Sequence, residues 1–193
     1  MKLFLIFLSS IIAIISPVIY MRAILKGQAK PHRTTRFVLL VISLLATISL
    51  FAQHDHVAIW LAGIAFIQAI FIFFLSLKRG MGGWSFLDIL CLLIATLGII
   101  LWQTTKNPAL ALYGSIGADF TGMVPALIKT YKWPHTEIWL FYCMDVFAGV
   151  FSVLAVPQWS LQAVSYPIYI ASINLLMTLL IIAPRFSKNA LSS

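Results

Sequence analysis

Long apolar runs separated by short polar stretches dominate this sequence. A run of about 20 apolar residues is what an α-helix needs to cross a bilayer, and a helix is the open-ended element that satisfies its own backbone there. The pattern therefore predicts an all-α integral membrane protein with seven transmembrane helices, the short second one extended by a turn at either end. The runs are Leu3 to about Ile24, Phe37 to Phe51, Val57 to Leu77, Phe86 to Trp102, Leu110 to Ile128, Ile138 to Val156, and Leu161 to Ala183.

The composition excludes an ordinary soluble domain. Hydrophobic residues make up 62% of the chain and charged residues 9%, which is too little charge to cover a water-exposed surface. The 13 Lys and Arg outnumber the 5 Asp and Glu, but they lie between the apolar runs. We therefore interpret them as topology signals and contacts with anionic lipids, and not as a nucleic-acid surface. The short loops favour a multi-pass protein of a bacterial plasma (inner) membrane.

The basic residues also predict the orientation. They gather in the loop after the first run and directly after the third, fifth and seventh runs, which all fall on one side of the membrane. Lys2 and Lys106 fall on the other side. The excess of positive charge on the cytoplasmic side places the N-terminus outside and the C-terminus in the cytoplasm.

The first three runs resemble the last three in the positions of their prolines, basic loops and amide side chains. In each set a proline interrupts the first helix, a basic loop follows, Pro-His precedes the second helix, and the third helix carries an amide. The matched positions are Pro17 and Pro125, Pro31-His32 and Pro134-His135, and Gln68 and Asn174.

These matches predict two triple-helix repeats, residues 1–77 and 107–193, joined by a linker helix within 78–106. With a single linker helix the two repeats insert in the same direction, an arrangement that transporters use. Pro17 and Pro125 remove a backbone hydrogen bond from their helices, so they are the candidate hinges.

This three-one-three plan, with a proline in each first helix and a basic loop after it, resembles the SWEET and PQ-loop superfamily. The Lys30-Pro31-His32-Arg33 segment is similar to a small bacterial branch of that group. Val18 and Ala126 stand where the superfamily has a glutamine after the proline, which leaves the subfamily open. The resemblance implies transport of a sugar, an amino acid or a vitamin precursor by alternating access between the repeats.

Two acids inside the predicted spans are the leading site candidates, because charge at bilayer depth is costly. Asp119 lies in the fifth run and Asp145 in the sixth. The segment from Asp145 to Ser152 is similar to the sixth helix of lysosomal cystine exporters, which implies a proton-coupling role for Asp145. The other interpretation of each acid is a structural hydrogen bond to a neighbouring helix.

Gln68 and Asn174 complete the predicted substrate-binding set. The resemblance implies a substrate contact for Asn174 directly and for Gln68 approximately. An amide donates and accepts hydrogen bonds, which suits a hydroxyl-bearing or amide-bearing solute. Adhesion between helices is the competing explanation.

The remaining polar residues add little chemistry. His32 and His135 are expected to shape the turn into the following helix, and Asp88 to favour a helix N-terminus. His54-Asp55-His56 lacks the third ligand and supporting shell that a metal site needs, so we expect neither metal nor cofactor. No nucleophile with a base, phosphate loop or pair of catalytic acids can be assembled, so we expect no enzyme.

The sequence thus predicts a secondary transporter or facilitator for a small polar solute, and the resemblance implies proton coupling through Asp145. A membrane receptor or assembly factor on the same helical plan, without transport, is the alternative. One copy contains both repeats, so a pathway does not require assembly, and the sequence leaves a monomer and a small homo-oligomer both open.

Overall fold

The computed structural model describes residues 2–52, 58–83, 85–104, 108–156 and 158–190. Within these ranges the chain is all-helical, which confirms the predicted all-α class and the number of long helices. The elements are α1 (Lys2–Leu25), α2 (Arg33–Ala52), α3 (Ala58–Arg79), α4 (Phe86–Thr104), α5 (Pro108–Lys132), the 3-10 helix η1 (Pro134–Thr136), α6 (Trp139–Ala155) and α7 (Leu161–Ala190).

The helices follow the apolar runs closely. The second run extends at both ends into α2, as the pattern predicts, and the seventh continues past Ala183 to Ala190. Pro17 lies inside α1 and Pro125 inside α5, and both helices continue through them. The predicted hinges therefore lie where one backbone hydrogen bond is missing from an otherwise intact helix. His54-Asp55-His56 lies outside the described residues.

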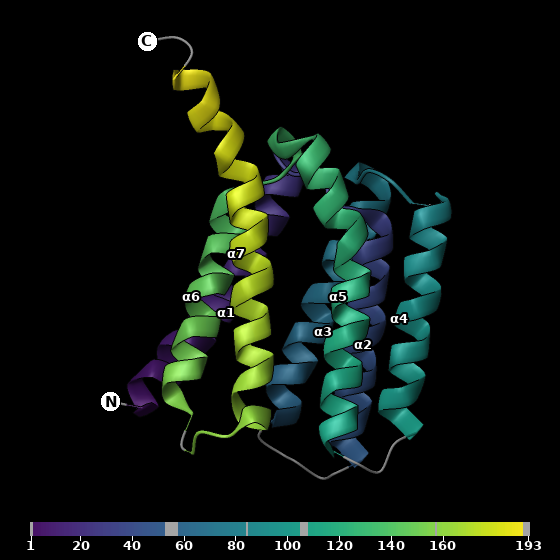
Figure 1. Ribbon diagram of the computed structural model, residues 1–193, viewed down its shortest axis with the longest axis vertical. Coiled ribbons are helices and arrows are strands. Elements are labelled where there is room, and N and C mark those ends of the chain that lie inside the picture. The colour runs from purple at the N-terminus through teal and green to yellow at the C-terminus, as the bar shows by residue number, and fades with distance from the viewer. Residues whose placement is uncertain (1, 53–57, 84, 105–107, 157, 191–193) are drawn as a thin grey trace. The chain divides into compact units, whose positions relative to one another are not determined.

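The helices group into two packing units (Figure 1). Unit 1 contains residues 1–29 and 127–193, and unit 2 contains residues 30–126. Unit 2 is thus one continuous stretch, whereas unit 1 joins the first helix to the last two. These units differ in membership from the sequence repeats at 1–77 and 107–193, and the repeats remain a prediction about the sequence.

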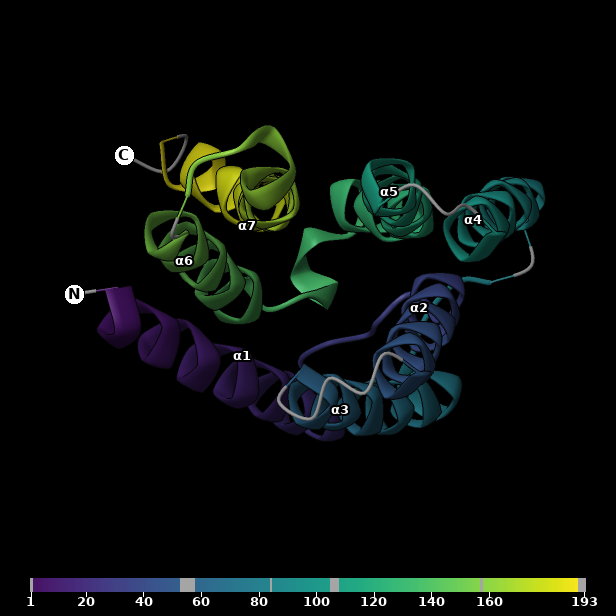
Figure 2. The same cartoon turned by 90° about the horizontal axis from the view of Figure 1, so that it is seen from below.

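In unit 1 the central helix is α6. It packs against α1 on one side and α7 on the other, and Figure 2 shows the three side by side in that order. Gly149 permits a close approach to α7, because a Cβ at this position would lie 2.9 Å from Ala171 N and 3.0 Å from Pro167 O. The missing side chain therefore sets the distance between α6 and α7.

In unit 2 helix α2 packs against α3 and α4. A Cβ on Gly122 of α5 would lie 2.5 Å from Val38 Cγ1, so α5 also approaches α2 closely. The segment before α2 is bound to the loop after α3 by two backbone hydrogen bonds. Met81 N–H donates to Pro31 O at 2.9 Å, and Arg33 N–H donates to Met81 O at 3.1 Å.

Among the described residues, two helices are long and apolar enough to cross a membrane, α1 and the Leu161–Pro184 part of α7. α6 is also apolar, at 17 residues. The exposure of individual side chains also agrees with a membrane environment. Phe86 is 83% exposed and Leu161 74%, whereas Ser16 is fully buried and Glu137 is 2% exposed. Apolar groups on the surface and polar groups inside are expected of a protein that is solvated by lipid.

Candidate functional site

Helices α1 and α6 run antiparallel and share two polar contacts in one register. The hydroxyls of Ser9 and Ser152 lie 2.9 Å apart. Seven residues further along α1 and seven back along α6, Ser16 Oγ donates to Asp145 Oδ1 at 2.5 Å. Ser16 is fully buried and Asp145 half-buried. We call these residues, Ser9, Ser16, Asp145 and Ser152, the polar seam.

The seam continues at the next turn of α1 to a buried ion pair. Tyr20 stacks on Phe141 of α6, with ring centroids 4.3 Å apart, and its hydroxyl donates to Glu137 Oε2 at 2.9 Å. The other carboxylate oxygen, Oε1, lies 2.5 Å from Lys129 Nζ. Polar contacts thus extend along one face of α1 from Ser9 to Tyr20.

The ion pair is held by the turn between α5 and α6. Lys129 occupies the last turn of α5, and Pro134 opens the 3-10 helix that leads to Glu137. The side chains are 3% and 1% exposed, respectively. At such burial either charge would be strongly unfavourable alone, so each requires the other. This pair, together with Tyr20, connects α1, the end of α5 and the segment before α6.

An open groove of about 650 Å³ lies beside this ion pair. Its polar lining comes from the C-terminal end of α1, the loop that follows, and the segment leading into α6, and the remainder is apolar. We call it the basic groove and define it by Arg22, Lys26, Gln28, His135, Glu137 and Trp139.

The loop on one side of the basic groove is a well-formed helix end. Gln28 N–H donates to Ala23 O at 2.9 Å, and Gly27 N–H donates to Ile24 O at 3.0 Å. Gly27 has a φ of 73°, the left-handed conformation that this Schellman motif requires and that glycine adopts without strain. Lys26 and Gln28 are therefore positioned by hydrogen-bonded backbone.

Two of the predicted site residues, Asp145 and Asn174, lie in unit 1. Asn174 is 8% exposed, and its side-chain amide donates to Ile170 O of its own helix at 2.9 Å. Asp145 accepts from Ser16 on a different helix. Asp145 therefore belongs to an interhelical contact, and the amide N–H of Asn174 to a contact within α7.

The other two predicted site residues, Gln68 and Asp119, lie in unit 2. Gln68 is half-buried on α3, and Asp119 is 9% exposed on α5. Gly122, which follows Asp119 on α5, is the position that Val38 of α2 approaches. The predicted hinge Pro125 lies at the end of unit 2, one residue before its last residue, Ala126.

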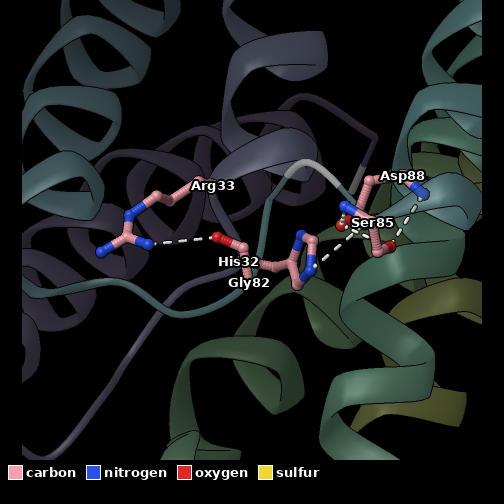
Figure 3. Close-up of polar contacts among 5 residues, drawn as sticks. All are labelled: His32, Arg33, Gly82, Ser85 and Asp88. Atoms are coloured by element: carbon pink, nitrogen blue, oxygen red, sulfur yellow. Dashed lines mark hydrogen bonds and ion pairs between the residues drawn. The ribbon is translucent and has the colours of Figure 1, made fainter.

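Unit 2 contains a second polar cluster, at the start of α4 (Figure 3). His32 Nε2 lies 3.4 Å from Asp88 Oδ1. Asp88 Oδ2 accepts from Ser85 N–H at 3.0 Å, while Ser85 Oγ accepts from Asp88 N–H at 3.2 Å. This reciprocal pattern is a capping box with aspartate at its third helical position. Asp88 thus caps α4, as expected, and also contacts a histidine from another segment.

The loop after α3 is shaped around His32. Gly82 has a φ of 68°, and a Cβ there would overlap the imidazole of His32. Arg33 Nη1–H donates to Gly82 O at 3.1 Å, which holds the loop from the other side (Figure 3). Ser85 Oγ also donates to the Asp88 carboxylate, at 2.7 Å. In this order the carboxylate lies between the serine and the histidine, so the histidine does not activate the hydroxyl as a nucleophile.

A smaller, mainly apolar cavity of about 220 Å³ adjoins this cluster. Phe37, Phe73 and Leu92 contribute to its lining, with Arg33 and Asp88 at its polar edge. Its walls offer few groups that could orient a polar solute.

Four residues of this site, Ser16, Tyr20, Lys129 and Glu137, are not among the site residues that the sequence predicts. The position of Lys129 after an apolar run indicates a topology signal, because the sequence does not distinguish a buried lysine from a loop lysine. A signal for Glu137 exists, because it is the only glutamate in the chain. The spacing of Ser9, Ser16 and Tyr20 also places them on one helical face.

Among the described residues, no three His, Cys, Asp or Glu side chains gather into a group that could hold a metal ion. Comparison of the chain with protein-family models, curated proteins and solved structures found no match.

Proposed function

We propose that the chain crosses a bacterial plasma membrane seven times, with its N-terminus outside. Its long helices contain 17 to 30 residues. At about 1.5 Å per residue, even 17 residues extend roughly 26 Å, close to the hydrocarbon thickness of about 30 Å. Each long helix carries exposed large apolar side chains, and lipid is the solvent that these side chains favour. Trp133 and Trp159, both exposed near helix ends, suit the headgroup region.

Within that membrane the protein acts as a secondary transporter or facilitator for a small polar solute. The observation that carries this proposal is the polar seam and its continuation to the ion pair of Lys129 and Glu137. Polar groups are expensive in hydrocarbon and mark solute or ion pathways in membrane proteins. The seam offers hydroxyls and a carboxylate, and near it the basic groove offers an opening to water.

Asp145 is the carboxylate that we assign to proton coupling. It lies in the seam, where it accepts from the Ser16 hydroxyl, and a solute or proton would compete for that hydrogen bond. Asn174, Gln68 and Asp119 are further candidate contacts for the solute, in keeping with the resemblance to the SWEET and PQ-loop superfamily. Pro17 lies beside Ser16, so bending of α1 at this residue would alter the seam.

Flux into proteoliposomes tests the transport proposal. Purified protein is reconstituted and screened with labelled sugars, amino acids and vitamin precursors at several pH values. We expect saturable uptake of one class, reduced at least about tenfold by Asp145→Asn or Ser16→Ala, since a hydrogen bond to a charged group contributes about 1.5–3 kcal/mol. Any pH dependence of the wild type should disappear in Asp145→Asn.

Ser10→Ala is the matched control, because the Ser10 hydroxyl donates to Ile6 O within α1 and lies outside the seam. It should transport at the wild-type rate. If no solute class is taken up, and the seam variants only lower the melting temperature, the seam is structural. The receptor or assembly function then becomes the better explanation.

A further inference from the structure

The basic groove has the properties of a ligand site that the seam does not explain. It is a hollow of about 650 Å³ bordered by Arg22, Lys26 and His135. All three side chains are exposed, so they remain accessible to a ligand from solution or from the membrane surface. The groove lies within unit 1, and α1, the loop after it and the start of α6 provide its walls.

The charge of the groove favours an anion. Glu137 is the only acid in its lining, and this carboxylate already contacts Lys129 and accepts from Tyr20. Lys129 therefore compensates the negative charge of Glu137, and the positive charges of Arg22 and Lys26 remain in excess within the groove. A guanidinium presents paired donors that match phosphate oxygens, and an ammonium adds a point charge.

The remainder of the groove suits a ligand with an apolar part. Ile19, Ile138 and Leu140 line it beside Trp139, whose side chain is 39% exposed. An amphipathic aromatic of this kind is typical of the boundary between lipid and water. A ligand that joins a phosphate group to an apolar part would match this surface. Its phosphate would contact the cations, and its apolar part would contact the exposed apolar wall.

We propose that the basic groove binds a phosphate ester through Arg22 and Lys26, with His135 and Gln28 as further donors. The phosphate can belong to the headgroup of an anionic lipid or to a soluble ester, because the recognising chemistry is the same. This proposal goes beyond solute transport and is independent of it, since binding is measured without flux.

Binding to purified full-length protein in a neutral detergent tests the proposal. The probes are phosphatidylglycerol and glycerol 3-phosphate, with phosphatidylcholine as the comparison for net charge, and the readouts are thermal shift and native mass spectrometry. We expect phosphatidylglycerol to bind at least about tenfold more tightly than phosphatidylcholine, with an affinity that falls as salt is raised. Arg22→Gln/Lys26→Gln should remove most of that preference, by about tenfold.

Lys132→Gln is the matched control, because Lys132 is an exposed cation of unit 1 that does not line the groove. It should leave binding unchanged. If the double variant is unstable, Lys26→Gln alone gives the comparison. Stabilisation by both probes assigns the site to the phosphate itself, and stabilisation by the lipid alone assigns it to a headgroup. The proposal is overturned if neither probe binds, or if Lys132→Gln weakens binding as much as the groove variants do.

Discussion

Asp88 serves two purposes with one carboxylate. Its Oδ2 accepts from the Ser85 backbone N–H, and its Oδ1 lies 3.4 Å from His32 Nε2. The residue is 4% exposed, so both interactions are shielded from water. A single side chain thereby fixes the start of α4 and attaches it to the segment that precedes α2.

Replacing Asp88 should cost more than removing the cap alone. We expect Asp88→Ala to lower the free energy of unfolding by about 2–4 kcal/mol, because it removes a cap and a buried charged partner together. Ser85→Ala removes only the cap hydroxyl and should cost about 1 kcal/mol. Denaturation of both variants in detergent measures the difference. Equal losses would show that the His32 contact contributes nothing.

The distance between two helices can depend on one glycine. Gly149 lets α6 approach the backbone of α7 near Ala171. Gly117 of α5, in contrast, has open space where a Cβ would lie. The two glycines therefore provide a matched test of helix packing.

We expect Gly149→Ala to destabilise unit 1 by about 1–3 kcal/mol, because backbone atoms of α7 must move away. Gly117→Ala should be neutral or stabilising by up to about 1 kcal/mol, since alanine favours a helix and meets no neighbour. Melting temperatures of the two variants, measured under identical conditions, check this. A destabilised Gly117→Ala with an unaffected Gly149→Ala would contradict this packing of α6 against α7.

At the scale of elements, the apolar runs predicted the helices well. Each run became one helix, because apolar length and polar punctuation are local properties of the chain. Which helices pack against each other, in contrast, is not determined by local sequence. The pairing of α1 with α6 brings Ser16 to Asp145, and neither residue identifies the other in the sequence.

Some residues of the candidate site can likewise be selected from the sequence, whereas others are identified only by the fold. Asp145 could be selected from the sequence, because an acid in an apolar run is conspicuous. Lys129 could not, because only the fold distinguishes a buried lysine from a loop lysine. Asp88 was correctly placed at a helix N-terminus, while its contact with His32 required the tertiary structure.

For the whole molecule, the number and direction of crossings is the property with the widest consequences. In the proposed topology five crossings, α2 to α6, separate the loop after α1 from the loop after α6, so the two loops should lie on opposite sides of the membrane. Both loops contain an exposed glutamine, Gln28 in the first and Gln158 in the second. These positions allow a labelling test with the same substitution on each side.

In a background without Cys91 and Cys143, we expect Gln158→Cys to react with a membrane-impermeant maleimide in intact cells. Gln28→Cys should react only after the cells are permeabilised, because the basic loop is expected in the cytoplasm. Labelling of both variants after permeabilisation is the control for accessibility. Labelling of both in intact cells would contradict seven crossings with an external N-terminus.

The pairing of α1 with α6 also has a consequence for synthesis. Tyr20 and Glu137 are separated by 117 residues, and the whole of unit 2 lies between them in the chain. At about 5–20 residues per second, a ribosome needs roughly 6 to 23 seconds to make that stretch. During that interval Ser9, Ser16 and Tyr20 are already made, while their partners Ser152, Asp145 and Glu137 do not yet exist. Helix α1 therefore completes its contacts with α6 only after α6 has been made, and an insertase or chaperone that shelters α1 would act in this interval.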